Sequence, residues 1–266
     1  MLPALWLPSW KTSDTVKEAV KDHDNDSTPR ADCSTCPHRE DRLNNGRCHP
    51  GDACVRVMSG RQIARFFTVN PDLADQYAGD EFWERRAIAA RYLSQQRLMK
   101  MLDDPDEVVR RVLAYRLPVD ELGALIGDPD REVRITVADR IPINQLEPLV
   151  KDDDYLVRQY VAKRIHPGRL FRMINDPDRE VRKTVAQRLP TESLELMMND
   201  PSAEIRIVIA ERIDIDSIRP MMRDHDWRVR LTVCQRLPLN ILHEMKHDED
   251  EDVRDAVKRR LREERH

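Results

Sequence analysis

Hydrophobic and polar positions recur through most of this chain with a period of 24 residues. In the unit spanning residues 128–151, Val133, Val137, Ala138 and Ile141 fall at spacings that share one face of an α-helix. Two aliphatic columns show how strictly the pattern returns: Val109, Val133, Val157, Val181, Ile205, Val229 and Val253, and Leu117, Ile141, Ile165, Leu189, Ile213, Leu237 and Leu261. The pattern therefore predicts a repeat protein built from helices.

Each unit carries the signals of one helix and one shorter element. Asp128 suits an N-cap and Pro129 the first helical position, because proline needs no amide partner there. Pro142 ends the helix, since proline has no amide donor and crowds the preceding turn. Pro148 lies inside the second element, and Pro220 occupies the same position three units later. Proline disfavours regular α-helical hydrogen bonding there, so we expect a short, 3₁₀-like segment.

Charged residues follow the same period in four columns. An aspartate opens each unit: Asp80, Asp104, Asp128, Asp152, Asp176, Asp200, Asp224 and Asp248. An arginine follows six residues later: Arg86, Arg110, Arg134, Arg158, Arg182, Arg206, Arg230 and Arg254. A second arginine column contains Arg116, Arg140, Arg164, Arg188, Arg212, Arg236 and Arg260, and a second aspartate column contains Asp106, Asp130, Asp154, Asp178, Asp226 and Asp250.

The planar guanidinium of arginine matches a carboxylate, so we expect these columns to pair within a unit or with the next unit. The alternative is a stripe that binds an acidic partner or a nucleic-acid backbone. Apolar burial within a single unit does not offset the entropy of ordering its backbone, so the units must stack as a solenoid. We place this solenoid and its charged C-terminal cap at residues 80–266, and a junction or cap at residues 61–79.

Four of the five cysteines lie close together at Cys33, Cys36, Cys48 and Cys54. Thiolates bind soft or borderline metals, and four of them complete either a zinc site or an iron–sulfur cluster. We therefore expect a small metal-binding domain over residues 31–60 with these four ligands. Two disulfides are disfavoured, because five cysteines in a chain of this length do not indicate a secreted scaffold.

The spacing alone leaves the metal open. Zinc ribbons usually have two tight cysteine pairs, and the five residues between Cys48 and Cys54 exceed that spacing. His38 and His49 are spare candidate ligands, although four cysteines already complete either site. The fifth cysteine, Cys234, falls in a column of alanines, so we expect it to be a buried thiol.

Composition narrows the class further. Charged residues are 35% of the chain and only seven glycines occur, with neither of the two common glycine-rich nucleotide motifs. A net charge of −4 is atypical of a general nucleic-acid or membrane binder. Residues 1–30 are expected to form an arm that packs Trp6 and Trp10 onto the body. The apolar start is too short to span a membrane and lacks a basic segment before it, so we expect a cytoplasmic protein.

The unit DPDREVRITVADRIPINQLEPLVK resembles the repeat of the leucine-rich repeat variant family, and the four-cysteine block resembles the iron–sulfur domain that precedes those repeats. Together the two resemblances cover about residues 31–262. They imply an all-α, right-handed superhelix of alternating α- and 3₁₀-helices, and a [4Fe–4S] cluster on Cys33, Cys36, Cys48 and Cys54. The departures from the repeat replace prolines and should loosen only single turns: His166, Asp214, His225 and Glu249.

The resemblance supplies no activity. We predict an iron–sulfur protein whose solenoid is a scaffold for a protein partner, with the cluster acting as a redox sensor, an electron carrier or a staple. One alternative is a solenoid that binds nucleic acid through its arginine columns. The other is a HEAT-like repeat enzyme, but the one pair His243–Glu244 is too few for a two-iron site. We find no catalytic constellation, and infer neither a membrane nor a small-molecule substrate.

Overall fold

The computed structural model of the chain describes residues 28–263. It divides into two compact units, one ending at Val69 and the other beginning at Asn70. The expected contacts of Trp6 and Trp10 lie outside the described residues. No helix within residues 28–263 is both long and apolar enough to cross a bilayer.

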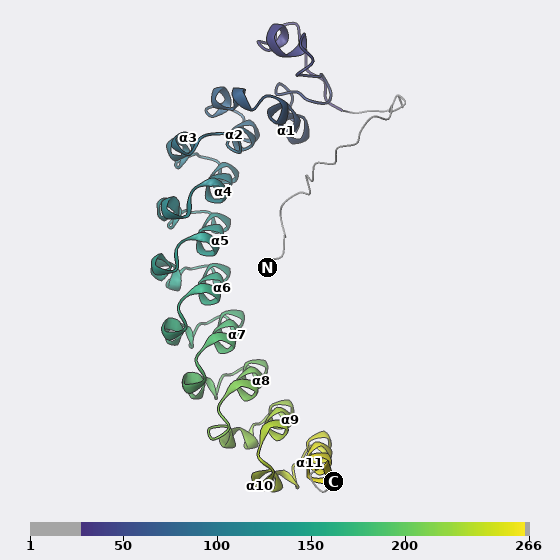
Figure 1. The fold of residues 1–266 in the computed structure, drawn as a ribbon, viewed down its shortest axis with the longest axis vertical. Coiled ribbons are helices and arrows are strands. Elements are labelled where there is room, and N and C mark those ends of the chain that lie inside the picture. Colours follow the sequence, from purple (N-terminus) through teal and green to yellow (C-terminus); the bar gives the residue numbers. More distant parts are fainter. Residues whose placement is uncertain (1–27, 264–266) are drawn as a thin grey trace. The chain divides into compact units, whose positions relative to one another are not determined.

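The second unit is a solenoid in which α-helices alternate with shorter helices, mostly 3₁₀ (Figure 1). Its α-helices are α2 (Trp83–Ala89), α3 (Gln95–Leu98), α4 (Glu107–Arg116), α5 (Arg131–Arg140), α6 (Tyr155–Arg164), α7 (Arg179–Arg188), α8 (Ala203–Arg212), α9 (Trp227–Arg236), α10 (Leu239–Leu242) and α11 (Glu251–Glu263). Its 3₁₀-helices are η2 (Pro71–Tyr77), η3 (Met99–Met101), η4 (Val119–Leu125), η5 (Ile143–Gln145), η6 (Glu147–Lys151), η7 (Pro167–Met173), η8 (Thr191–Met197), η9 (Arg219–Arg223) and η10 (His243–Met245). The described residues contain no β-strand, which confirms the predicted all-α repeat architecture.

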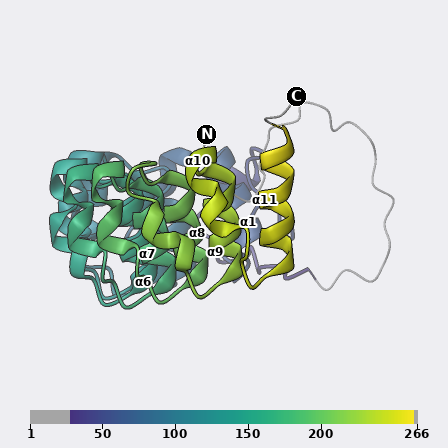
Figure 2. The ribbon, with the colours of Figure 1, turned by 90° about the horizontal axis from the view of Figure 1, so that it is seen from below.

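Helices α4 to α9 line the inner side of the curve that this unit follows, and the shorter segments, with α3 and α10, line its outer side (Figure 1). Viewed from below, successive α-helices such as α6 to α9 lie side by side (Figure 2). Each helix therefore covers its neighbours, as expected for units that cannot bury their apolar faces alone.

The aliphatic columns form the core between these layers. Val133, Val137 and Ile141 of one unit are fully buried, and so is Leu146 from its outer segment. Cys234 is fully buried in α9 at a position where other units have alanine, which confirms the predicted packed thiol. Proline shapes the outer segments as well: η6 and η9 both begin immediately before a proline.

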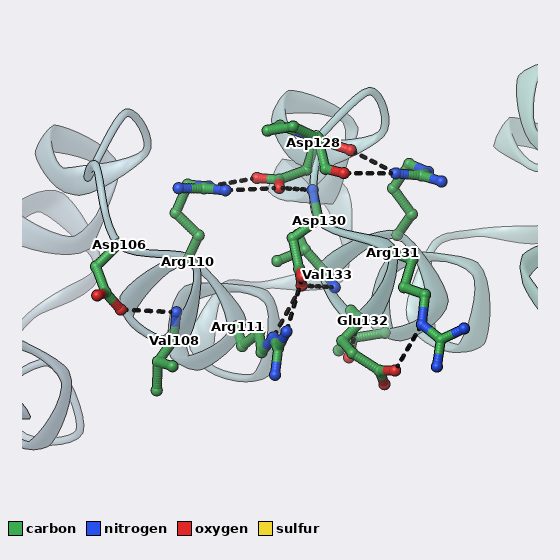
Figure 3. Close-up of polar contacts among 12 residues, drawn as sticks. Asp106, Val108, Arg110, Arg111, Asp128, Asp130, Arg131, Glu132 and Val133 are labelled. Atoms are coloured by element: carbon green, nitrogen blue, oxygen red, sulfur yellow. Dashed lines mark hydrogen bonds and ion pairs between the residues drawn. The ribbon is translucent and has the colours of Figure 1, made fainter. Parts of the chain in front are cut away.

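The predicted N-cap at the aspartate that opens each unit is wrong. In α5 the N-cap is Asp130, whose carboxylate accepts a hydrogen bond from the backbone N–H of Val133 at 3.1 Å. Asp128 instead accepts the N–H of Asp130 at 2.8 Å and the guanidinium of Arg110 from the preceding unit (Figure 3). Helix α5 begins at Arg131, so Asp128 lies two residues before its N-cap and its carboxylate binds the tertiary partner instead.

The first arginine column pairs with the aspartate that opens the next unit, as predicted. Arg110 Nε and Nη2 bind the two carboxylate oxygens of Asp128 at 2.8 and 3.1 Å (Figure 3). Arg110 Nη1 also donates to the backbone oxygen of Asp104 at 2.7 Å. Equivalent ion pairs link every unit to the next, with both side chains 15% exposed or less: Arg86–Asp104, Arg110–Asp128, Arg134–Asp152, Arg158–Asp176, Arg182–Asp200, Arg206–Asp224 and Arg230–Asp248.

The prediction that the second arginine column pairs with carboxylates is wrong. Its side chains bind backbone carbonyls instead. Arg188 Nη1 donates to the carbonyls of Ala162 and Ile165 at 2.6 and 3.0 Å, at the C-terminal end of α6. Helix ends leave carbonyl groups without partners, and a cation there also complements the helix dipole. Each unit thus caps the helix of the unit before it.

Candidate metal centre

The four clustered cysteines belong to the first unit, which contains few regular elements. A turn joins Cys33 to Cys36, with the Cys36 N–H donating to the Cys33 carbonyl at 3.3 Å. A five-residue π-helical turn, η1 (Arg39–Leu43), follows, and α1 (Gly60–Val69) closes the unit. An isolated bridge between His49 and Ala53 holds the loop that separates Cys48 from Cys54.

Two glycines allow the chain to reverse within this segment. Gly46 and Gly51 have φ angles of +67° and +87°, in the left-handed region where a Cβ atom is strained. Gly46 precedes Cys48, and Gly51 lies between Cys48 and Cys54. Both reversals therefore help to bring the later cysteines back toward the earlier pair.

Helix α1 anchors the later cysteines. The backbone N–H of Cys54 donates to the Gln62 carbonyl at 3.2 Å, and Gln62 Nε2 donates to the Pro29 carbonyl at 2.9 Å. Phe66 and Phe67 are fully buried below this layer, with their rings edge to face at 5.5 Å. The sequence analysis did not identify Gln62 as part of the site; its signal is a polar residue on the buried face of α1.

All four cysteines are free thiols, but they differ in burial. Cys48 and Cys54 are 7% and 2% exposed, whereas Cys33 and Cys36 are partly exposed. Burial raises the pKa of the Cys48 thiol to about 12, and the three other cysteines of the cluster contribute to the rise. Burial also raises the pKa of Cys33, with Cys54, Cys36 and Asp32 adding to it and Arg39 opposing it. The other three thiols therefore lie within electrostatic range of Cys48.

The chemistry of this donor set fits a soft metal centre. A buried thiol with a raised pKa stays protonated when no metal is bound. A bound metal stabilises the thiolate form and displaces the proton. In the arrangement described for residues 28–263, no three histidine, cysteine or carboxylate side chains form a group that could hold a metal ion. Convergence of the four sulfur atoms on one centre therefore stays a prediction.

The two spare histidines occupy different surroundings. His38 is buried, with its ring 5.6 Å from that of Phe66 and its Nδ1 3.8 Å from an Asp41 oxygen. Burial lowers the pKa of His38, which favours the neutral ring. His49 is exposed, and its backbone takes part in the bridge to Ala53. The described contacts thus explain His38 by packing and place His49 at the surface.

The pair considered for a HEAT-like enzyme lies in the solenoid, in η10. Glu244 accepts a hydrogen bond from Arg219 Nη2 at 2.5 Å, across to the neighbouring unit. That carboxylate is therefore engaged in a contact between repeats. His243 belongs to no group of potential metal ligands in the part of the chain that the structure describes.

Comparisons with known proteins find relatives of both the cysteine-bearing segment and the solenoid. Residues 29–76 match the family described as "LRV protein FeS4 cluster", and residues 179–202 match "Leucine rich repeat variant". A solved structure of "a leucine-rich repeat variant with a novel repetitive protein structural motif" is 55% identical, with a TM-score of 0.82. That similarity covers 88% of this chain and 100% of the other.

A curated protein from Rhodobacter capsulatus is also similar. It is an uncharacterized 27.7 kDa protein in the nifB 3' region, and it is 39% identical over 87 residues. The match covers 33% of this chain and spans 35% of the length of that relative.

Proposed function

Because the chain belongs to the leucine-rich repeat variant family, in the group with an iron–sulfur domain, we propose that it holds a [4Fe–4S] cluster on Cys33, Cys36, Cys48 and Cys54 and uses its solenoid to bind a protein partner. The observation that carries the proposal is that all four cysteines of the matched segment are free thiols within one compact unit. A bound cluster of this type supplies one-electron chemistry. The chain's own residues hold it, exclude water from the Cys48 and Cys54 side, and leave the Cys33 and Cys36 side partly open.

Features that the solenoid leaves exposed support the scaffold role. Its two arginine columns are engaged between units, which favours a structural role over a stripe for phosphate groups. Large aromatic side chains stand exposed at the first residues of α2, α6 and α9. They are Trp83, Tyr155 and Trp227, each 38–39% exposed and three repeats apart. Exposed aromatic residues are enriched at protein interfaces, and solenoids commonly bind partners along their curved side.

The first test is the metal content of the full chain purified without air. We expect iron and sulfide together with the charge-transfer absorption of an iron–sulfur cluster. The variants Cys48→Ser and Cys54→Ser should lose most of the iron. The matched control is Cys234→Ala, which introduces the residue found at that position in other repeats and should keep its iron. Zinc without charge-transfer absorption, or full iron content in Cys48→Ser, would contradict the cluster assignment.

The second test separates a redox role from a staple. We expect a reversible one-electron change in a potentiometric titration, with helix content by circular dichroism unchanged. A cluster that changes oxidation state only as the protein unfolds would refute the redox role while leaving the cluster itself in place.

A further inference from the structure

Charge is distributed unevenly between the two units of the chain. Residues 28–69 contain seven arginines and no lysine against four carboxylates, a net charge of +3, although the whole chain carries −4. Residues 1–27 carry a net charge of −2 and residues 70–266 a net charge of −5, so residues 28–69 form a basic segment in an otherwise acidic chain.

The arginines of the two units are used in different ways. In the solenoid, the two arginine columns are engaged by carboxylates and carbonyls of neighbouring units. In the first unit, six of the seven arginines are exposed. Among residues 28–263, neither Arg30 nor Arg39 forms an ion pair or a side-chain hydrogen bond, and Arg39 acts on the Asp32 carboxylate only at longer range.

These exposed arginines lie next to the cysteines. The Arg39 N–H donates to the Cys36 carbonyl at 3.1 Å, which places Arg39 beside the first cysteine pair. The Arg30 side chain crosses the turn at Gly51, where a Cβ atom would lie 3.4 Å from its Cγ and Nε atoms. Arg56 follows Cys54 by two residues and is exposed. Each of the three exposed arginines thus lies beside a cysteine or beside the turn between Cys48 and Cys54, and we refer to Arg30, Arg39 and Arg56 as the basic rim.

The same part of the unit leaves two cysteines partly exposed. Cys33 and Cys36 are accessible to solvent, whereas Cys48 and Cys54 are covered by the core of the unit. Electron exchange between proteins requires that their redox centres approach closely. Any such approach is therefore easiest at the exposed pair, beside the basic rim.

Resting on the proposed function, we infer that the basic rim is the docking surface for a small acidic electron-carrier protein. Interfaces of this class are small and short-lived, and complementary charge steers their formation. A cationic surface beside partly exposed cluster ligands would attract an acidic carrier and would let the two redox centres approach each other. A nucleic-acid partner is less well matched, because the acidic remainder of the chain would repel a long polyanion.

Binding of the iron-loaded full chain to an acidic [2Fe–2S] ferredoxin tests the inference, measured by titration calorimetry at low and at high salt. We expect the dissociation constant to rise about tenfold or more with salt, because the attraction is screened. The double variant Arg30→Glu/Arg39→Glu should bind about tenfold more weakly at low salt than the unchanged protein. A basic c-type cytochrome should bind more weakly than the ferredoxin.

The matched control is Arg91→Glu/Arg223→Glu, which reverses two exposed solenoid arginines that form no ion pair within residues 28–263. It should change the dissociation constant by less than about twofold. Equal weakening by both double variants, or no binding by the unchanged protein at low salt, would overturn the docking surface. Retention on duplex DNA that is lost in Arg30→Glu/Arg39→Glu, without ferredoxin binding, would also overturn it in favour of a nucleic acid.

Iron and sulfide content, measured on the same samples, keeps the two proposals separable. Protein that contains no cluster contradicts the proposed function. Iron-loaded protein that does not bind the acidic carrier contradicts only the docking surface. Helix content by circular dichroism confirms that each variant is folded.

Discussion

Removing one carboxylate from the arginine–aspartate column should destabilise the solenoid far more than removing an exposed charge. Arg158 Nε and Nη2 donate to the two oxygens of Asp176 at 2.7 and 2.9 Å, and the side chains are 10% and 5% exposed. The same carboxylate accepts the backbone N–H of Asp178 at 2.9 Å. Asp176→Ala therefore leaves a largely buried guanidinium and one backbone N–H without their acceptor.

Breaking a buried, hydrogen-bonded ion pair by removing one partner costs about 3–5 kcal/mol. Asp176→Ala should lower the free energy of unfolding by about that amount. The matched control is Glu147→Ala, whose carboxylate is 38% exposed and pairs with Arg169 and Arg172. Exposed pairs contribute only about 0–1 kcal/mol, so this control should stay close to the unchanged protein.

Urea denaturation followed by far-UV circular dichroism measures the decrease in the free energy of unfolding. Hydrogen exchange in α6 and α7 shows where in the solenoid the decrease arises. Localisation matters because repeat arrays can unfold unit by unit rather than in one transition. The double variant Arg158→Met/Asp176→Leu should recover part of the loss, because it leaves no buried charge without a partner. If Asp176→Ala stays within about 1 kcal/mol of the unchanged protein, the ion pair does not hold adjacent units together.

Two further predictions concern the second arginine column and acid stability. Arg188→Met removes the hydrogen bonds to Ala162 and Ile165, so the free energy of unfolding measured by urea denaturation should fall by about 1–3 kcal/mol. An unchanged urea midpoint would indicate that water replaces the guanidinium. Hydrogen bonding to Arg228 lowers the pKa of Asp226 to about 2 from 3.8, so its stabilisation is present above pH 3.8 and is lost as pH falls toward 2. The protection of α9 amides from hydrogen exchange, relative to the intrinsic exchange rate at each pH, should therefore fall across that interval, and protection that stays constant down to pH 2 would contradict this role of Asp226.

The candidate site was only partly predictable from the sequence. The spacing of Cys33, Cys36, Cys48 and Cys54 indicated a metal-binding segment, because clustered thiols at short spacing have few other uses in such a chain. It could not show which pair is buried, since that depends on how α1 packs beneath the loop. The contribution of Gln62 was missed for the same reason: its bond to Pro29 joins residues 33 positions apart.

The sequence by itself determined the repeat. The 24-residue period, the buried aliphatic columns and the prolines that end each helix are local signals, and the structure confirms the alternation of α- and 3₁₀-helices that they favour. It also predicted that Arg158 pairs with an aspartate of its own or the next unit, because the charges of the two columns are complementary, and the structure shows the pair with the next unit.

Only the tertiary structure decided how each polar group is used. Helix α5 begins at Arg131, so Asp130 caps it, whereas Asp128 lies two residues before the cap and binds Arg110 of the preceding unit. Arg188 binds helix-end carbonyls rather than a carboxylate, because stacking places it over the end of α6. A local pattern specifies which groups need a partner, whereas the stacking of units fixes which partner lies within hydrogen-bonding distance.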